Sequence, residues 1–517
     1  MSIENFPPIM FAGLIVVMLI GFPVAFSLAA LGLGCGFFAI SMGWFPAEYM
    51  SNLPLAMFSI LSNDLLLAIP FFTFMGTILE KCGLAEDMLD SMGQLFGPVK
   101  GGLGYSVIIV GFILGAITGT VAGQVIAMAL ISLPVMIRYG YNMRYATGVL
   151  AASGTITQLV PPSLVLVVLA DQLGKPVGDM YKGAWGPSLL QIALFAIYTY
   201  GLGVFKPHYI PGIPKEARTL DGWALWKKCL KGIVPSAVLI FTVLGSMGGL
   251  PFQSHAIATP TEAGAMGVIG ALILAAMHKR LTKDLLWEAM YGTMRLTAMV
   301  VFILIGSRVF SQVFQGVDGS KWVEHLLTGL PGGQVGFLIV VNIFVFFLAF
   351  FLDFFEIAFI IVPMLAPVAA KLGIDLVWFG VILCVNLQTS FMHPPFGFAL
   401  FYLRGIADTL FKEKRIPVPV KSNDIYMGSI PWVIMQIMLV AVVIFIPQTV
   451  TVFLDKEEVI DIDKVKIEMP ADDTKVDPAS LLTDGKADAE KEAASNQVTE
   501  KQSADDDQKA LEALMKK

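Results

Sequence analysis

The chain has 517 residues, of which 56% are hydrophobic and only 14% charged, with a formal net charge of −6. Soluble domains carry roughly 25% charged residues, so this composition excludes an ordinary soluble domain and indicates an all-α, polytopic membrane protein. No basic stretch suggests nucleic-acid binding. The four cysteines form no CxxC pair, which argues against a zinc or disulfide framework.

A helix needs about 20 apolar residues to span a membrane. Residues 9–42 are apolar and contain Gly21-Phe-Pro23 in the middle, which indicates two helices or one broken helix. Residues 54–79 form the next predicted span. The stretch from Glu80 to Lys100 has mixed charge and is expected to be a loop.

Two unusual apolar runs follow. Residues 101–137 have the Gly/Thr-rich centre Gly115-Ala-Ile-Thr-Gly-Thr-Val-Ala-Gly123, and each arm is short for a crossing. This pattern favours a re-entrant hairpin, with two ordinary spans and a tight turn as the alternative. Residues 142–173 contain Pro161-Pro162, which must break the helix because proline lacks a backbone N–H. Such a break is tolerated in a membrane only where it is buried in protein or lines a cavity.

A polar linker over residues 206–232 separates two transmembrane repeats, predicted at residues 1–205 and 233–453. The linker contains six lysine and arginine residues, so we expect it in the cytoplasm. Trp223 and Trp226 lie beside lysines, which suggests an interfacial amphipathic helix. Counting spans from this linker places both chain termini outside.

The second half has the same plan. Residues 336–370 form a predicted hairpin, interrupted at Leu352-Asp-Phe-Phe-Glu356, and residues 376–407 form a helix broken at Pro394-Pro395. The acidic tail over residues 454–517 has no Phe, Trp or Tyr and is predicted to be disordered.

The two halves align at a constant offset of 233 residues. Pro161-Pro162 fall on Pro394-Pro395, and Thr120 falls on Asp353. The span count places the ends of the two hairpins on opposite sides of the membrane. The sequence therefore predicts inverted repeats with one hairpin and one broken helix in each, a plan typical of secondary transporters.

The hairpin tips and broken helices are expected to meet near the middle of the membrane. Serine, threonine and asparagine oxygens together with exposed carbonyls suit sodium, while helix N-termini suit an anion. The predicted sodium ligands form one group in each half: Gly119, Thr120, Ser153, Gly154 and Thr155, and then Asp353, Asn386, Gln388 and Thr389. The alternative is that these small residues only permit close helix packing.

Asp353 is an ionisable residue inside an apolar run, which favours an ion ligand over a structural cap. Arg308 lies within a predicted span and is a candidate for a bidentate contact with a substrate carboxylate. It could equally neutralise an acid or reach the membrane surface. His393 is a candidate for proton coupling or a packed neutral residue, and Glu262 is expected to cap a helix. The remaining predicted substrate-binding residues flank the breaks: Thr157, Ser163 and Ser390.

An enzyme is not expected. The chain has no Walker A motif, no HExxH and no GxSxG, so ATP hydrolysis and these hydrolase mechanisms are excluded. No cofactor is expected apart from sodium as a coupling ion.

An ordered set of motifs resembles the large membrane subunit of tripartite ATP-independent periplasmic (TRAP) transporters. The resemblance covers roughly residues 8–453 and rests on six motifs: Ile20-Gly-Phe-Pro-Val-Ala25, Ile69-Pro-Phe-Phe72, Gly115-Ala-Ile-Thr-Gly-Thr120, Ala152-Ser-Gly-Thr155 with Pro161-Pro-Ser163, Thr259-Pro-Thr-Glu-Ala263 and Pro394-Pro-Phe-Gly397. The tip after Gly115 is usually rich in serine in this family, whereas this chain has threonine.

The resemblance implies an elevator-type, sodium-driven importer of organic acids in the bacterial inner membrane. It also implies two partners, a small four-helix membrane subunit and a periplasmic binding protein that delivers a carboxylate. A stand-alone anion transporter without a binding protein is the first alternative, and a membrane scaffold or channel without a coupled cycle is the second.

Overall fold

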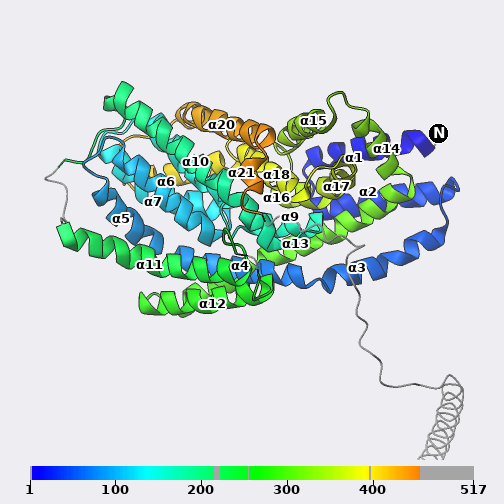
Figure 1. Ribbon diagram of the computed structural model, residues 1–517, viewed down its shortest axis with the longest axis horizontal. Coiled ribbons are helices and arrows are strands. Elements are labelled where there is room, and N and C mark those ends of the chain that lie inside the picture. The colour runs from blue at the N-terminus through cyan, green and yellow to red at the C-terminus, as the bar shows by residue number, and fades with distance from the viewer. Residues whose placement is uncertain (1–2, 215–221, 254, 395–396, 455–517) are drawn as a thin grey trace, which may run out of the picture. The chain divides into compact units, whose positions relative to one another are not determined.

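The computed structural model describes residues 3–214, 222–253, 255–394 and 397–454 (Figure 1). These residues form α-helices joined by short connections, and no strand is assigned among them. The first half contains these helices: α1 (Phe6–Ile20), α2 (Val24–Ser41), α3 (Leu53–Leu61), α4 (Asp64–Lys81), α5 (Leu84–Leu95), α6 (Gly102–Thr118), α7 (Val121–Arg138), α8 (Met143–Thr155), α9 (Leu164–Leu173) and α10 (Val177–Phe205).

The second half begins after the linker. It contains these helices: α11 (Gly222–Ser246), α12 (Pro260–Met277), α13 (Lys283–Gly316), α14 (Gly319–Thr328), α15 (Gly333–Leu348), α16 (Phe354–Glu356), α17 (Val362–Lys371), α18 (Leu376–Ser390), α19 (Phe398–Lys412), α20 (Ser422–Phe445) and α21 (Gln448–Thr451). Short 3₁₀ segments occur as well, and the π-helical segment η6 (Ile357–Ile361) joins α16 to α17.

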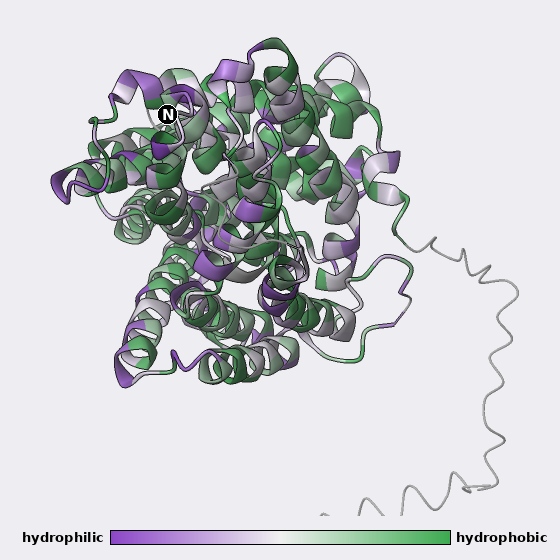
Figure 2. Ribbon diagram, turned by 90° about the vertical axis from the view of Figure 1, so that its left-hand side faces the viewer, coloured by the Kyte–Doolittle hydropathy of each residue, from purple (hydrophilic) through white to green (hydrophobic). Residues whose placement is uncertain are grey.

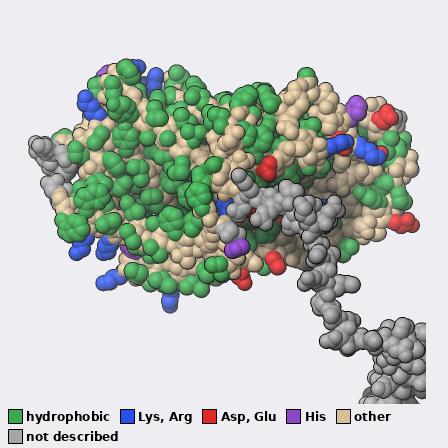
Figure 3. All heavy atoms as spheres, viewed as in Figure 1, with side chains coloured by type: hydrophobic (Ala, Val, Ile, Leu, Met, Phe, Trp, Pro, Cys, Tyr) green, Lys and Arg blue, Asp and Glu red, His purple; other side chains and the backbone are tan. Residues whose placement is uncertain are grey.

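Within the described residues, eight helices are long and apolar enough to cross a membrane, and two bent helix pairs also meet the criterion. Figure 2 shows that hydrophobic residues dominate most of the helices. In Figure 3 apolar side chains are spread over much of the visible face, while Lys and Arg lie mainly toward its edges. These findings confirm the prediction of an all-α, polytopic membrane protein.

Two elements early in the chain differ from the prediction. Residues 54–79 do not form one straight span, because α3 and α4 meet at a bend of 47°. Asn63 caps α4 there by accepting a hydrogen bond from the N–H of Leu65. The expected loop after Glu80 instead contains the helix α5. Its buried residues Leu84, Met88 and Met92 recur every four positions, a helical period that the charge content concealed.

The linker also differs from the prediction at its C-terminal end. Residues 222–246 form the single helix α11, which continues through the predicted boundary at residue 232. Trp223 and Trp226 are exposed near its N-terminus. The amphipathic stretch and the next span are therefore one continuous helix. The predicted tail, from residue 455 onward, lies outside the described residues.

The chain turns sharply between α6 and α7. Helix α6 ends at Thr118, Gly119 adopts a left-handed conformation with φ of 64°, and α7 begins at Val121. Glycine takes this conformation without the steric cost of a Cβ. The turn lies at the centre of the hairpin expected at residues 101–137. The depth of this turn in a membrane stays a prediction.

The two proline pairs coincide with interruptions in helical structure. Helix α8 ends at Thr155 and α9 begins at Leu164, while α18 ends at Ser390 and α19 begins at Phe398. Helix α19 then continues to Lys412, five residues beyond the predicted end of this run at residue 407. Each interruption ends where the next helix begins, at the N-terminus of α9 or of α19.

Helix α8 forms the centre of the packed interior. Every residue from Tyr145 to Thr155 is buried, and α8 packs against α6, α7, α19 and α20. A second group of helices packs pairwise, α2 along α13 and α4 along α12. Figure 1 shows α4, α11 and α12 running side by side. This arrangement places the first interruption, directly after α8, in protein rather than in lipid.

Candidate functional site

One cavity joins the segments that the sequence singled out. Its volume is about 310 Å³. It is lined by the α6–α7 turn, the interruption after α8, the α15–α16 connection, the interruption after α18, and two residues of α13. The lining residues are Gly119, Thr120, Val121, Ala122, Gln158, Leu164, Val165, Leu296, Met299, Asp353, Phe354, Phe355, Phe391, Phe398 and Tyr402.

Four helical segments begin at this cavity. Val121, Leu164 and Phe398 are the first residues of α7, α9 and α19, and Phe354 begins the helical run of residues 354–371. The N–H groups in the first turn of a helix lack partners within the helix and carry a partial positive charge. Their convergence favours an anion, although within the described residues no Lys, Arg or His side chain lines the cavity.

Gly119 and Thr120, two of the predicted sodium ligands, lie on the lining at the α6–α7 turn. Thr120 is extended, with φ of −127° and ψ of 130°, and its carbonyl oxygen accepts from the N–H of Gln124 at 3.3 Å. Both residues are partly exposed to the cavity. The structure therefore places this pair where a bound solute or ion would meet it.

Ser153, Gly154 and Thr155, the other predicted ligands of the first group, are buried at the end of α8. The hydroxyl of Ser153 donates to the carbonyl of Leu150 at 3.0 Å, and that of Thr155 donates to Ala152 at 3.0 Å. Neither residue lines the cavity.

Gly154 and Thr157 contribute to close packing beside this interruption. A Cβ at Gly154 would overlap Val125 of α7, so the alternative interpretation of close packing holds for this glycine. The hydroxyl of Thr157, a predicted substrate ligand, donates to Gln124 and to the carbonyl of Gly154. The side-chain amide of Gln124 also donates to the carbonyl of Ser153 at 2.8 Å. This hydrogen bond links α7 to α8.

Ser163, a predicted substrate ligand, is the residue directly before α9. Its hydroxyl oxygen accepts from the N–H of Val165 at 3.2 Å and donates to the carbonyl of Gln158 at 2.5 Å. Ser163 is therefore a helix cap that shapes the interruption. Its side chain does not line the cavity.

Asp353 lies on the lining and is the N-cap of the run of residues 354–371, which is the structural-cap alternative; its role as an ion ligand stays a prediction. Its backbone N–H donates to Oε2 of Glu356 at 3.0 Å, as in a capping box. Glu356 is buried, whereas Asp353 is partly exposed. Asp353 therefore both lines the cavity and forms the capping box with Glu356.

The remaining predicted ligands of the second half lie on the last turns of α18 and are buried. Asn386 donates to the carbonyl of Asn342 on α15 at 2.8 Å, and Gln388 accepts from Gln191 on α10 at 2.9 Å. Thr389 donates to the carbonyl of Asn386 at 2.7 Å, and Ser390 donates to that of Leu387 at 2.6 Å. None of the four lines the cavity.

Arg308, His393 and Glu262 lie away from the cavity lining. Arg308 is exposed on α13, so the structure does not bring it together with the other predicted substrate ligands. His393 packs against Phe346 and Phe350, with ring centroids 5.1 and 4.5 Å apart, as expected for a packed histidine. Glu262 forms a capping box with Thr259, which confirms its predicted role as a helix cap.

Several lining residues were not among the predicted ligands, namely Gln158, Phe354, Phe355, Phe398 and Tyr402. Gln158 lies three residues before Pro161, so its distance from the break was a usable signal. The aromatic residues carried no such signal, because phenylalanine is common throughout this chain. Among the described residues, no three His, Cys, Asp or Glu side chains gather as a metal site would require.

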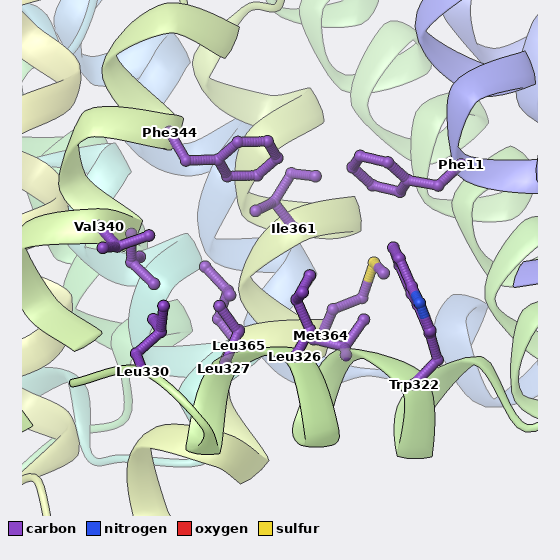
Figure 4. Close-up of a pocket in the computed structure, with 12 residues that line it drawn as sticks. Phe11, Trp322, Leu326, Leu327, Leu330, Val340, Phe344, Ile361, Met364 and Leu365 are labelled. Atoms are coloured by element: carbon purple, nitrogen blue, oxygen red, sulfur yellow. The ribbon is translucent and has the colours of Figure 1, made fainter. Parts of the chain in front are cut away.

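A second cavity, of about 370 Å³, has a different character (Figure 4). Phe11 of α1, Trp322 and Leu326 of α14, and Phe344 of α15 are among the residues that line it. Among the residues that the structure describes, none with an acidic, basic, amide or hydroxyl side chain is on this lining. This cavity is therefore not a candidate for a charged solute.

Comparison with known proteins places the chain in a family. The family described as "Tripartite ATP-independent periplasmic transporter, DctM component" matches residues 11–449. The C4-dicarboxylate TRAP transporter large permease protein DctM of Rhodobacter capsulatus is 27% identical over 456 residues, which cover 85% of this chain and 96% of that protein. The 2,3-diketo-L-gulonate TRAP transporter large permease protein YiaN of Escherichia coli is 25% identical, covering 83% of this chain and 95% of that protein.

A solved structure shares the fold. The crystal structure of the YdaH transporter from Alcanivorax borkumensis has a TM-score of 0.51 and 14% sequence identity, over 78% of this chain and 88% of that one. The family and the curated relatives are transporter permeases rather than enzymes, which confirms the expectation from the missing catalytic motifs. The chain belongs to the DctM component family of tripartite ATP-independent periplasmic transporters and is a large permease subunit of the bacterial inner membrane.

Proposed function

We propose that this permease is the transport subunit of a sodium-coupled importer of organic acids that depends on a periplasmic binding protein. The observation that carries the proposal is the single cavity at which both predicted hairpin tips and both helix interruptions meet. Discontinuous helices that converge in a membrane are typical substrate sites of secondary transporters.

The electrostatic character of this cavity supports an anionic solute. Four helical segments begin at the cavity: α7, α9, α19 and the run of residues 354–371. Helix N-termini attract carboxylates. The names of the two relatives specify C4-dicarboxylates and 2,3-diketo-L-gulonate, both of which are carboxylates. An organic acid is therefore the solute class that fits both observations.

Sodium coupling is supported by the oxygen atoms around the two interruptions. A hydroxyl group that donates its proton to a carbonyl still has lone pairs for a cation. Ser153 and Thr155 in the first half and Thr389 in the second are in this state. Asp353 adds a carboxyl at the second tip. Together these groups form the proposed sodium sites, one in each half.

The proposed partners are a small four-helix membrane subunit and a soluble binding protein that delivers the acid. An elevator-type movement would carry the cavity across the membrane. Helix α8 packs against α7 and α20, and α2 packs against α13 and α4 against α12; these two sets of helices support such a movement, with α4 contacting both α12 and α6.

The test is uptake of labelled organic acids into proteoliposomes that contain this chain and its small subunit. Uptake should require both an inward sodium gradient and the cognate binding protein. Uptake with sodium alone would favour the stand-alone transporter, and uptake driven only by the gradient of the solute would favour a channel.

A further inference from the structure

We propose that Gln124 is a positioning residue for the sodium site of the first half. It holds Thr120, at the α6–α7 turn, and Ser153, at the end of α8, in a fixed arrangement. This inference rests on the proposed function and specifies how its first ion site is held. It follows from the hydrogen bonds that one buried residue makes to several segments of the chain.

The backbone of Gln124 is bonded to the α6–α7 turn. Gln124 is the fourth residue of α7, and its side chain is completely buried. Its backbone N–H donates to the carbonyl of Thr120 at 3.3 Å, and Thr120 lies on the cavity lining. A displacement of Gln124 therefore also displaces the carbonyl and side chain of Thr120.

The side chain of Gln124 is bonded to three other segments. Its Nε2 atom donates to the carbonyl of Gly111 on α6 at 2.6 Å and to that of Ser153 on α8 at 2.8 Å. Its Oε1 atom accepts from the hydroxyl of Thr157, in the 3₁₀ turn η3 (Ile156–Gln158). An amide has two N–H donors and one acceptor oxygen, so all three functions of this group are in use.

The carbonyl of Ser153 depends on this contact. The last carbonyls of a helix lack partners within the helix, and α8 ends at Thr155. The carbonyl of Gly154 accepts from the hydroxyl of Thr157 at 2.6 Å, a donor from the same stretch of chain. The carbonyl of Ser153 accepts from Gln124, a donor on another helix. The orientation of Ser153 is therefore coupled to the position of α7.

Close packing limits the freedom of this linkage. A Cβ on Gly111 would lie 2.7 Å from the Cβ of Ser153, and a Cβ on Gly115 would lie 3.2 Å from the Cα of Thr157. Helix α6 thus packs directly against the end of α8 and against η3. Removal of the amide would leave buried carbonyl oxygens without a donor, which is unfavourable, so these segments would have to rearrange.

The second half does not repeat the linkage. At the offset of 233 residues, Gln124 falls on Ile357, the first residue of the π-helical segment η6. This segment is bonded to a different helix, because the hydroxyl of Ser307 on α13 donates to the carbonyl of Phe359 at 2.6 Å. The linkage through Gln124 is therefore specific to the first ion site.

Gln124→Met tests the inference, because methionine is similar in length but has no N–H donor. The assay is uptake of a labelled organic acid into proteoliposomes with the small subunit and the cognate binding protein. We expect the sodium concentration for half-maximal uptake to rise about tenfold, since Ser153 and Thr120 lose their common support. A lower maximal rate per inserted protein with an unchanged sodium requirement would indicate a merely structural role and overturn the inference.

Gln312→Met is the matched control. Gln312 on α13 also donates its amide to a backbone carbonyl of another segment, that of Tyr49, at 2.7 Å. It does not line the cavity. The same chemical change at this position should leave the sodium requirement of uptake unchanged. An equal increase in Gln312→Met would contradict a specific role for Gln124.

Thr157→Val provides a second and milder variant, because it removes only the hydroxyl that donates to Gln124 and Gly154. We expect a smaller rise in the sodium requirement, and no further rise when it is combined with Gln124→Met. Additive increases would mean that the two residues act separately. If Gln124→Met does not insert, an unchanged sodium requirement in Thr157→Val would overturn the inference.

Hydrogen exchange separates this inference from the proposed function. In the purified complex, protection of the backbone N–H groups at the α6–α7 turn should fall about tenfold in Gln124→Met. Unchanged protection would overturn the positioning role, even if uptake by the wild-type protein requires sodium. Lower protection together with wild-type uptake that needs no sodium would overturn the proposed function and leave the linkage in place.

Discussion

Hydroxyl groups around the interruptions donate their protons to carbonyls in the preceding turn of the same helix. Ser153, Thr155 and Thr389 do so over 2.7–3.0 Å. Thr155 also accepts a hydrogen bond from Gln436 of α20 at 2.9 Å, which uses one of its two lone pairs. Ser153 therefore keeps more of its lone pairs for a cation and is the stronger candidate of the two.

Asp353→Ala should reduce the sodium dependence of transport. Asp353 has the acidic side chain on the cavity lining, and losing this charge removes its attraction for a cation. We expect the sodium concentration for half-maximal uptake to rise about tenfold, measured in proteoliposomes at fixed solute. Asp284→Ala, at an exposed acid in the first turn of α13, is the control. A normal sodium response in Asp353→Ala would remove Asp353 from the site.

Gly154→Ala should destabilise the protein. Its Cβ would overlap Val125, and overpacking of this kind costs typically about 1–3 kcal/mol. The expected result is a lower midpoint of thermal unfolding in detergent. Gly201→Ala on α10 has open space around its Cβ and should be neutral or stabilising, since alanine favours a helix over glycine. Equal midpoints for the two variants would show that α8 and α7 are not packed as described.

At the scale of elements, α4 meets the first turn of α7 through an acid and a glycine. A Cβ on Gly123 would lie 2.8 Å from Cδ of Glu80, and closer still to one of its oxygens. The Glu80 carboxyl therefore packs against Gly123, and a side chain at position 123 would displace it. Glu80 is the penultimate residue of α4, and Gly123 is three positions beyond the tip residue Thr120.

Gly123→Ala should consequently impair transport, and Glu80→Ala should restore it. The single variant displaces the Glu80 carboxyl from its place between α4 and α7, while the second substitution removes the group that clashes. We expect initial uptake rates to fall severalfold in Gly123→Ala and to return near the Glu80→Ala level in the double variant. Additive losses in the double variant would mean that the two residues do not meet.

At the scale of the whole molecule, the described residues that line the cavity belong to the unit Met1–Asp455. The charged side chains on its surface pair across elements, as in Arg144 with Asp424 at 3.2 Å and Lys81 with Glu288. Such exposed pairs contribute about 0–1 kcal/mol each. The stability of the unit therefore rests on helix packing rather than on these ion pairs.

Deletion of residues 456–517 should leave membrane insertion and uptake unchanged. This segment has no aromatic residue, and its polar, charged composition has little apolar surface to bury. The measurement is sodium-dependent uptake per inserted protein, compared with the full chain. A severalfold loss of uptake with normal insertion would assign the tail a role in transport.

The all-α membrane architecture and both helix interruptions were predictable from the sequence, because each depends on local properties. Apolar runs of about 20 residues specify spans, and Pro161-Pro162 or Gly119 act on their own backbone. Thr120 and Asp353 were found for the same reason, since each lies at a break in an apolar run. Helix α5 was missed because its mixed charge concealed a four-residue apolar period.

Only the tertiary structure decided which polar residues face the cavity. Ser153, Thr157 and Gln158 are close together in the sequence, but only Gln158 lines the cavity. The direction of each side chain after a helix interruption depends on contacts with distant segments, such as Gln124 with Thr157. The aromatic lining has the same origin, because Phe398 and Tyr402 become site residues only where α19 begins beside α7 and α9. The sequence by itself therefore determined where the helices are interrupted, and the packing of distant helices determined which side chains line the cavity at these interruptions.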